Sequence, residues 1–309
     1  EAAAKRSRPH IRHTPLEHSP YLSSLAEADV FLKLDNIQKT GSFKFRGAIS
    51  KITSLTDKEK SNGVVTASTG NHGAACSLAM SELGIEGKII VPKNVHKNKI
   101  ENILNLGGEV EYYGDDCIHA EERAQEISKT TGATYISPYN DEAIVFGQGT
   151  LGMEISQDLK NVDAIFVSVG GGGLISGVGG YLKSVNRSIQ VHGVSPKNSC
   201  VMYESLNTGK QLDLPSKPTL SDGTAGGVEF GSITFEMCKE IVDDFTVVSE
   251  DEIAKGIHIG LEKNHQLIEG AAGAAIAGFI NQKEKFKGQT VVLVMCGGNI
   301  SSAVLKSIL

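Results

Sequence analysis

The chain has 309 residues, of which 40% are hydrophobic and 21% charged, a composition that suits a globular protein of one large domain or two ordinary ones. A net charge of −6, the absence of tryptophan and the lack of a dense basic run argue against a nucleic-acid-binding surface. The longest apolar run, 271–280, is too short to span a bilayer and predicts a short buried helix.

The cysteines favour a cytoplasmic location. They are odd in number, contain no C-x-x-C pair and stand at positions 76, 117, 200, 238 and 296. This usage predicts reduced thiols rather than disulfides or a zinc site. The first residues, EAAAKRSRPHIRH, lack the apolar segment of a secretory signal peptide, which fits the same compartment.

From residue 63 onward, apolar β-rich runs alternate with amphipathic helical stretches, the pattern of a parallel α/β protein. The first series predicts strands at 64–68, 88–92, 109–114 and 134–138, and helices at 71–84, 95–108 and 117–132. It predicts a small α/β domain at 63–138, with 1–62 and 139–309 forming a large domain.

A second series follows from about residue 145. It predicts strands at 163–169, 189–195 and 290–299, and helices at 147–159 and 174–185. The segment 207–228 is rich in proline, glycine and aspartate and predicts a long functional loop. Ser249, followed by acidic residues, predicts a helix N-cap.

Four consecutive glycines, Gly170, Gly171, Gly172 and Gly173, separate a predicted apolar strand from a helix. Consecutive glycines allow several N–H groups to face one anion, and a helix N-terminus adds positive potential, so the run predicts phosphate binding. No lysine or arginine lies between Val162 and Tyr181, so a phosphate held there could keep a proton and later donate it. The alternative, a tight strand–helix turn, needs only one or two glycines.

A second glycine pattern, G-x-G-x-x-G at 147–152, is interpreted as a glycine-rich helix start. No strand directly precedes it, and no acidic residue follows about 20 positions later, as a nicotinamide-binding fingerprint requires.

Three further segments carry candidate site residues. Lys44 lies between Phe43 and Phe45, and burial lowers a lysine pKa as Schiff-base chemistry requires, although a solvated lysine fits the segment taken alone. The predicted strand-to-helix turn at 67–73 could cradle a carboxylate or be an ordinary capped turn. Cys296 opens the segment Cys-Gly-Gly-Asn at the end of the last strand, either as a site residue or as a small buried hydrophobe.

The order GSFKFRGA, STGNHG, GGGGL and CGGN resembles the fold type II family of pyridoxal phosphate (PLP) enzymes. Within that family it is most similar to the branch of serine/threonine dehydratases and serine racemases. The resemblance covers essentially the whole chain, including Thr14-Pro15-Leu16. It implies an α/β fold of two open, twisted parallel-sheet domains, similar to the tryptophan synthase β subunit, with PLP as cofactor and a homodimeric assembly.

The resemblance also implies residue roles. Lys44 carries the cofactor as a Schiff base, Asn71 contacts the 3′-oxygen of its ring, and Cys296 faces the pyridine nitrogen. The remaining cofactor contacts are Phe43, Leu174 and the four glycines, Gly170 to Gly173. The substrate carboxylate is received by Ser68, Thr69, Gly70, Asn71 and His72.

These roles predict a β-eliminating ammonia-lyase that acts on L-threonine or L-serine. Lys44 would take the Cα proton as general base. Cys296 is a poor counter-ion for the ring nitrogen, which favours expulsion of the β-hydroxyl and release of a 2-oxo acid and ammonia. The expected partner is this small amino acid, with neither nucleic acid nor membrane.

Two departures from the family keep alternatives open. Relatives with a structural divalent metal carry acidic side chains just after the strand at 189–195. The segment 195–201 has none, so no metal is expected there, and Asp222 and Glu229 would be the first suspects for ligands from elsewhere. Thr69 keeps a hydroxyl where racemases of this branch have serine, so it is a second candidate catalytic residue and leaves a racemase open. A specialised dehydratase, for example for hydroxyaspartate, and a non-catalytic ligand-binding module are further alternatives; a nicotinamide oxidoreductase is the weakest.

Overall fold

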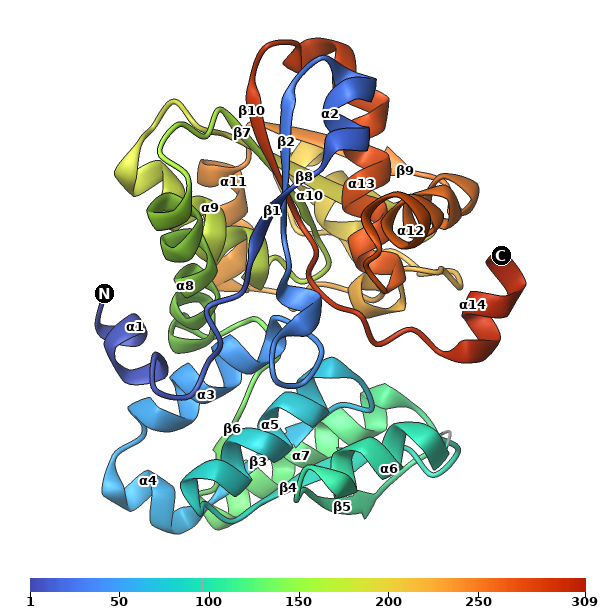
Figure 1. Ribbon diagram of the computed structural model, residues 1–309. Coiled ribbons are helices and arrows are strands. Elements are labelled where there is room, and N and C mark those ends of the chain that lie inside the picture. Colours follow the sequence, from blue (N-terminus) through green and yellow to red (C-terminus); the bar gives the residue numbers. More distant parts are fainter. Residues whose placement is uncertain (96) are drawn as a thin grey trace. The chain divides into compact units, whose positions relative to one another are not determined.

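A computed structural model describes residues 1–95 and 97–309, and the internal contacts divide the chain into two compact units (Figure 1). The first unit comprises Glu1–Arg12 and Lys44–Gly147, and the second comprises His13–Phe43 and Gln148–Leu309. The predicted small domain at 63–138 lies inside the first unit, which also takes in residues 44–62. Whether the boundaries predicted from the sequence separate independent domains stays a prediction.

Among its described residues, the first unit has a four-stranded parallel sheet of order β5-β4-β3-β6. Its strands are β3 (Val64–Ala67), β4 (Gly87–Val91), β5 (Glu109–Tyr112) and β6 (Thr134–Tyr135). Its helices are α1 (Ala2–Ser7), α3 (Lys44–Ser54), α4 (Asp57–Asn62), α5 (Asn71–Leu83), α6 (Lys97–Asn105) and α7 (Cys117–Thr131).

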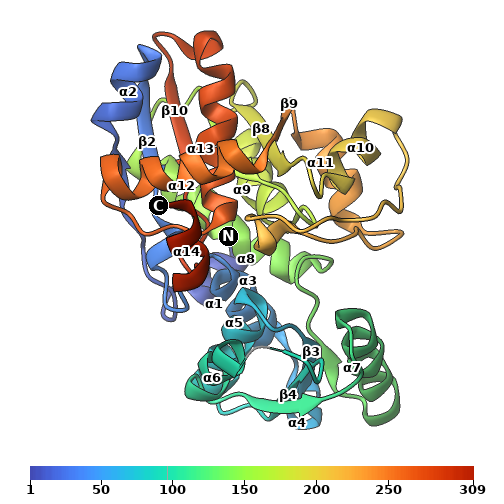
Figure 2. The same cartoon turned by 90° about the vertical axis from the view of Figure 1, so that its right-hand side faces the viewer.

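Strand β4 shows why helices cover both faces of this sheet. Ile89 and Val91 pack in one cluster with side chains of α5 and α6, whereas Ile90 packs in another with alanines of α7. Successive side chains of a strand face opposite sides, so both faces need a helical cover. Figure 2 shows α5 and α6 on one side of the sheet and α7 on the other.

The second unit has, among its described residues, a six-stranded sheet of order β1-β2-β10-β7-β8-β9. Its strands are β1 (Leu16–His18), β2 (Asp29–Lys33), β7 (Ala164–Ser168), β8 (Gln190–Pro196), β9 (Asp244–Val248) and β10 (Thr290–Val294). All neighbours are parallel except β1, which pairs antiparallel with β2 at one edge. The expected parallel sheet therefore carries one antiparallel edge strand.

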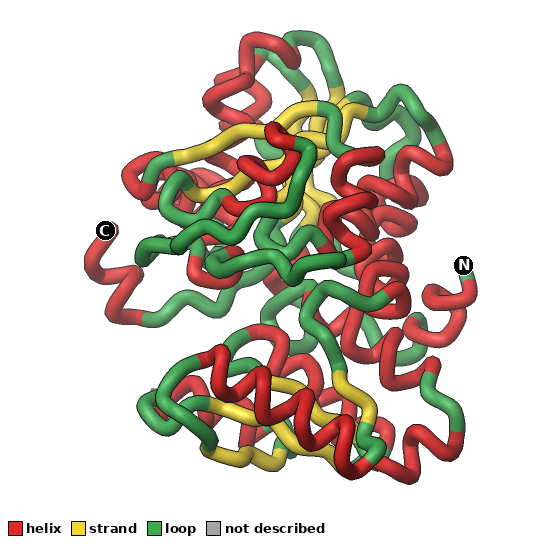
Figure 3. Tube along the Cα trace, turned by 180° about the vertical axis from the view of Figure 1, so that it is seen from behind, coloured by secondary structure: helices red, strands yellow, loops and turns green. Residues whose placement is uncertain are grey.

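Figure 3 shows helices and strands in both units. Helix α8 (Glu142–Asp158) begins in the first unit and ends in the second. The other helical elements of the second unit are α2 (Pro20–Ala26), η1 (Asp35–Ile37), α9 (Gly173–Val185), α10 (Val201–Thr208), η2 (Asp222–Thr224), α11 (Ile233–Ile241), α12 (Glu250–Asn264), α13 (Gly270–Gln282), η3 (Lys283–Phe286) and α14 (Ser302–Ile308). No described helix is both long and apolar enough to cross a membrane.

The strand order of the second unit reverses at β7 and β10. From β7 the chain continues through α9 to β8 and then β9, whereas β10 pairs on the other side of β7. In Figure 1, α9 lies on one face of the sheet and α13 on the opposite face. Such a switch point opens a crevice outside the carboxyl ends of the two strands, where α/β proteins bind ligands.

The sequence predicts that the glycine pattern at 147–152 lies at the start of a helix. In the structure it lies inside α8, because this helix begins at Glu142. A Cβ atom at Gly152 would lie 2.8 Å from the carbonyl oxygen of Val178 on α9. The glycines at this end of α8 therefore serve close helix packing rather than a dinucleotide.

Candidate functional site

The glycine turn and the segment after β10 lie at one edge of the larger sheet. Gly170 to Gly173 follow β7, and Cys296 follows β10, its neighbour in the sheet. Because parallel strands end at the same edge, the fold brings these two predicted site segments to the switch point.

The turn has the conformation that only glycine adopts readily. Gly172 has φ +83° and is the N-cap residue of α9. A Cβ atom at Gly170 would lie 2.7 Å from the carbonyl oxygen of Thr224, and one at Gly172 would lie 3.0 Å from the Cys238 Sγ. The N-cap has no side chain to bond the first-turn amides of α9, so this helix end suits a phosphate group.

The Cys296 thiol is buried and neutral. Burial, followed by the nearby Glu269 carboxylate, raises the pKa of this thiol well above its ordinary value of 9.0. Glu269 is itself buried, and its carboxylate accepts a hydrogen bond from the Asn299 amide at 3.2 Å. A Cβ atom at Gly297 would lie 2.5 Å from this carboxylate, so glycine is required beside it.

The chain that leads into Lys44 is tied to the segment after β10. The Phe43 amide donates to the Cys296 carbonyl at 2.9 Å, and the Gly298 amide donates to the Gly41 carbonyl at 2.9 Å. The position of Phe43, one residue before Lys44, is therefore fixed by a backbone hydrogen bond to Cys296, the predicted partner of the ring nitrogen.

Lys44 is the first residue of α3 in the first unit and is half-buried. Its Nζ donates to the Pro138 carbonyl at 2.8 Å, just beyond the end of β6. Its charge also acts on two buried groups of α5, lowering the pKa of His72 and opposing the raised pKa of Cys76. The ammonium thus donates to the Pro138 carbonyl and lies close to the N-terminal turns of α5.

Residues 68–70 form the turn between β3 and α5, and Asn71 and His72 are the first residues of α5. This is the edge at which ligands are expected in this sheet. Gly70, the N-cap residue of α5, provides no side chain to the first helical amides, which suits a carboxylate. Ser68 and Thr69 are half-buried, while His72 is buried.

His72 cannot offer a cation to a carboxylate. Its Nε2 donates to the Ile136 carbonyl at 3.0 Å, and burial, followed by the charge of Lys44, lowers its pKa to about 3. The neutral ring braces the turn, so any contribution of His72 to carboxylate binding would come from its backbone N–H.

This buried neutral histidine predicts a pH-dependent stability of the first unit. Between pH 6.5 and about 3, the unfolded chain binds a proton at His72 that the folded chain excludes. The free energy of unfolding should therefore fall with decreasing pH, by up to about 1.4 kcal/mol per pH unit from this residue. Hydrogen exchange of β3 and β4 amides between pH 7 and 4.5 should show this slope in the wild type and a flatter one in His72→Gln. Parallel profiles would contradict the assignment.

The segment that replaces the family's metal ligands forms hydrogen bonds instead. Ser195 Oγ donates to the Val169 carbonyl at 2.7 Å, and Ser199 Oγ accepts from the Gly226 amide at 3.0 Å. Among residues 1–95 and 97–309, no three histidine, cysteine, aspartate or glutamate side chains are arranged to hold a metal ion. The expected absence of a metal stays a prediction.

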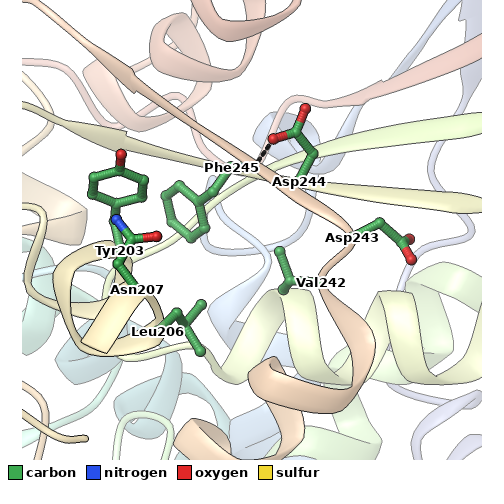
Figure 4. Close-up of a pocket in the computed structure, with 7 residues that line it drawn as sticks. All are labelled: Tyr203, Leu206, Asn207, Val242, Asp243, Asp244 and Phe245. Carbon is green, nitrogen blue, oxygen red and sulfur yellow. Dashed lines mark hydrogen bonds between the residues drawn. The ribbon is translucent and has the colours of Figure 1, made fainter. Parts of the chain in front are cut away.

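A pocket of about 310 Å³ lies apart from these segments, between α10 and the start of β9 (Figure 4). It is lined by Tyr203, Leu206, Asn207, Val242, Asp243, Asp244 and Phe245. None of the predicted site residues lines it. The Asp243 carboxylate forms an ion pair with Lys183 at 2.8 Å, so it already has a partner within the fold.

Sequence reasoning missed the residues that support the site. The backbone of Thr224 packs against Gly170, and Thr234 donates a hydrogen bond to the Gly171 carbonyl at 2.6 Å. Thr234 and Gly171 are 63 positions apart, and no local pattern links them.

Comparisons with known proteins agree with this geometry. The model of the pyridoxal-phosphate-dependent enzyme family matches residues 7–297. An L-threonine ammonia-lyase from Thermotoga maritima is 40% identical over 97% of this chain and 74% of its own length. A threonine deaminase structure from Solanum lycopersicum has a TM-score of 0.95 at 32% identity, covering 99% of this chain and 85% of that one. A maize serine racemase structure has a TM-score of 0.94 at 31% identity, covering 99% of this chain and 94% of that one.

The fold and the family match together define a PLP-dependent enzyme. The chain belongs to the fold type II branch of these enzymes, and the predicted family, α/β fold and cofactor are confirmed. The roles of individual site residues stay predictions.

Proposed function

We propose that the protein is a PLP-dependent ammonia-lyase that converts L-threonine, L-serine or both to the 2-oxo acid and ammonia by β-elimination. The observation that carries the proposal is the 40% identity, over 97% of the chain, to an L-threonine ammonia-lyase. Protein reconstituted with PLP should release 2-oxo acid and ammonia in equal amounts from one of these amino acids.

The residues that would hold the cofactor have the chemistry that each contact needs. Lys44 offers a primary amine for the cofactor aldehyde, and Gly170 to Gly173 offer backbone N–H groups for its phosphate. Asn71 would bond the ring 3′-oxygen, while Phe43 and Leu174 would contact the ring region. Once bound, PLP accepts the electron pair left at the substrate Cα when its proton is removed.

The chain's own residues favour elimination. Lys44 serves as the general base for the Cα proton. Cys296 presents a neutral thiol rather than a carboxylate to the ring nitrogen, so it does not hold a full positive charge there. The segment between Val162 and Tyr181 has no lysine or arginine, so a phosphate held by the glycine turn would meet no cation of this segment and could keep a proton for the leaving hydroxyl.

The substrate carboxylate would bind at the N-terminus of α5. Ser68, Thr69, Gly70, Asn71 and His72 supply hydroxyl and amide groups there, with the neutral His72 ring turned to the Ile136 carbonyl. The N–H groups and hydroxyls at this helix N-terminus would bind and orient the carboxylate of the amino acid.

A serine racemase is the second candidate function, favoured by the similarity to the maize structure. Inversion at Cα needs a proton donor on the face opposite Lys44, and the resemblance of the segment STGNHG to the racemase motif would put Thr69 on that face. A threonine side chain is β-branched and stiff at χ1, so its hydroxyl is harder to aim than that of serine.

Substitutions at Thr69 should therefore separate the two reactions. Thr69→Ala should keep 2-oxo acid formation within about tenfold, the scale of one lost neutral hydrogen bond, and abolish any racemisation. Thr69→Ser should raise the share of racemisation. Both activities are measured together by keto-acid assay and chiral chromatography. Loss of elimination and racemisation in parallel in Thr69→Ala would refute a face-specific role.

Removal of divalent metal should leave the enzyme intact. Treatment with a chelator is expected to change neither activity nor melting temperature, because 195–201 offers hydroxyls and no carboxylate. A large loss that Mg²⁺ or Ca²⁺ restores would show that a metal binds through other residues, with Asp222 and Glu229 to be substituted first.

We also propose a cytoplasmic homodimer. All five cysteines are free thiols in the structure, which supports a reducing compartment. The dimer is supported by the family resemblance and is tested by light scattering of the holoenzyme.

A further inference from the structure

Carbonyl groups in and next to the glycine turn accept hydrogen bonds from other parts of the second unit. The Gly171 carbonyl accepts from Thr234 Oγ1 at 2.6 Å, and the Gly172 carbonyl accepts from the Ser176 amide at 3.0 Å. Ahead of the turn, the Val169 carbonyl accepts from Ser195 Oγ at 2.7 Å. Only the bond from Ser176 belongs to the regular pattern of α9; the other two come from side chains of distant elements.

The bond from Thr234 sets the direction of an amide. A peptide group is planar and trans, so its C=O and N–H point in opposite directions. With the Gly171 carbonyl fixed on Thr234, the N–H of Gly172 is directed away from α11. Glycines on both sides of this peptide leave it little intrinsic resistance to rotation, so the hydroxyl determines its orientation.

The hydrogen-bond partners of Thr234 make its hydroxyl the donor in this bond. It is fully buried as the second residue of α11, and its Oγ1 lies 2.7 Å from Ser232 Oγ. Ser232 Oγ in turn accepts from the Phe235 amide as the N-cap of α11. Because the Gly171 carbonyl can only accept, the Ser232 hydroxyl donates to Thr234, and Thr234 donates to Gly171.

The space around the turn does not allow a simple substitute. A Cβ atom at Gly172 would lie 3.1 Å from the Cβ of Thr234, so the backbone of the turn rests directly on this side chain. Thr234 therefore both packs against the turn and donates to its Gly171 carbonyl, at 2.6 Å.

We propose that Thr234 is a positioning residue for anion binding: its hydroxyl holds the Gly171–Gly172 peptide so that the Gly172 N–H faces the cofactor phosphate. The proposal rests on the assignment of the phosphate to the glycine turn made above.

The test compares PLP with pyridoxal, which has the same ring and aldehyde but lacks the phosphate. Dissociation constants of both are measured on apoprotein of the wild type, Thr234→Val, Thr234→Ser and Thr246→Val. Thr246 is the matched control, because it is a buried threonine in β9 whose hydroxyl has no hydrogen-bond partner among the described residues.

Thr234→Val should weaken PLP binding by about tenfold or more, the scale of leaving one buried carbonyl unsatisfied, and should leave pyridoxal binding unchanged. Thr234→Ser, which keeps a hydroxyl, should bind PLP within about threefold of the wild type, and Thr246→Val should match the wild type for both ligands.

Two results would overturn the proposal alone: wild-type affinity of Thr234→Val for PLP, or an equal loss for PLP and pyridoxal. If the wild type itself did not distinguish PLP from pyridoxal, the phosphate assignment would fail and the role of Thr234 with it.

Discussion

Replacement of Lys44 by alanine should abolish turnover while leaving the fold in place. Loss of a general base alone costs about 10²- to 10⁴-fold, and Lys44 is also the proposed point of covalent cofactor attachment. The side chain is half-buried at the start of α3 and donates to the Pro138 carbonyl at 2.8 Å, so its removal opens no fully buried core position. PLP should still bind Lys44→Ala through the glycine turn.

The control is Lys51, on the same helix, whose Nζ is paired with Asp141 at 2.6 Å. Borohydride reduction of the wild-type holoenzyme should attach the cofactor to the peptide that contains Lys44 and leave Lys51 unlabelled. Label on any other lysine, or Lys44→Ala with more than a tenth of the wild-type rate, would overturn the site.

Replacement of Lys33 by methionine should produce the largest loss of stability. The Lys33 side chain is fully buried, and its Nζ lies 2.8 Å from Glu154 Oε2 and 2.7 Å from the Thr14 carbonyl. Without this cation, the buried Glu154 carboxylate loses the ammonium that lies 2.8 Å from its Oε2. Breaking one side of such a pair costs about 3–5 kcal/mol of unfolding free energy.

Urea unfolding of the apoprotein measures this cost without a contribution from bound ligand. The double variant Lys33→Met/Glu154→Leu should recover part of the loss, because two apolar residues can replace a buried pair. Lys287→Met removes an exposed lysine paired with Glu27 and should leave the unfolding midpoint nearly unchanged. A loss below about 1 kcal/mol for Lys33→Met would contradict the account.

The elements that were predicted from the sequence are those whose ends or burial are determined by residues close together in the chain. Helix α5 spans Asn71–Leu83, one residue short of the predicted end, with Gly84 as its left-handed C-cap. Ser249 forms a capping box with Glu252 at the start of α12. The apolar run at 271–280 is the buried core of α13. The glycine turn likewise follows β7 directly and opens α9.

What escaped prediction depends on distant partners. Strand β9 was not predicted; it lies at the edge of the sheet and is defined by its pairing with β8. The Lys33–Glu154 pair and the Thr234–Gly171 bond join residues far apart in the chain, and no periodicity marks either. The site motifs were recognised through their family resemblance, whereas the residues that brace them became visible only in the fold.

The most direct test of the proposed function is a substrate panel on the wild-type holoenzyme. L-threonine, L-serine, their D enantiomers and 3-hydroxyaspartate are supplied in turn, and 2-oxo acid, ammonia and the opposite enantiomer are measured in the same reaction. The account predicts equal amounts of 2-oxo acid and ammonia from L-threonine or L-serine, formed faster than any enantiomer. An enantiomer of serine that forms faster than pyruvate, or bound PLP with no turnover of any substrate, would contradict it.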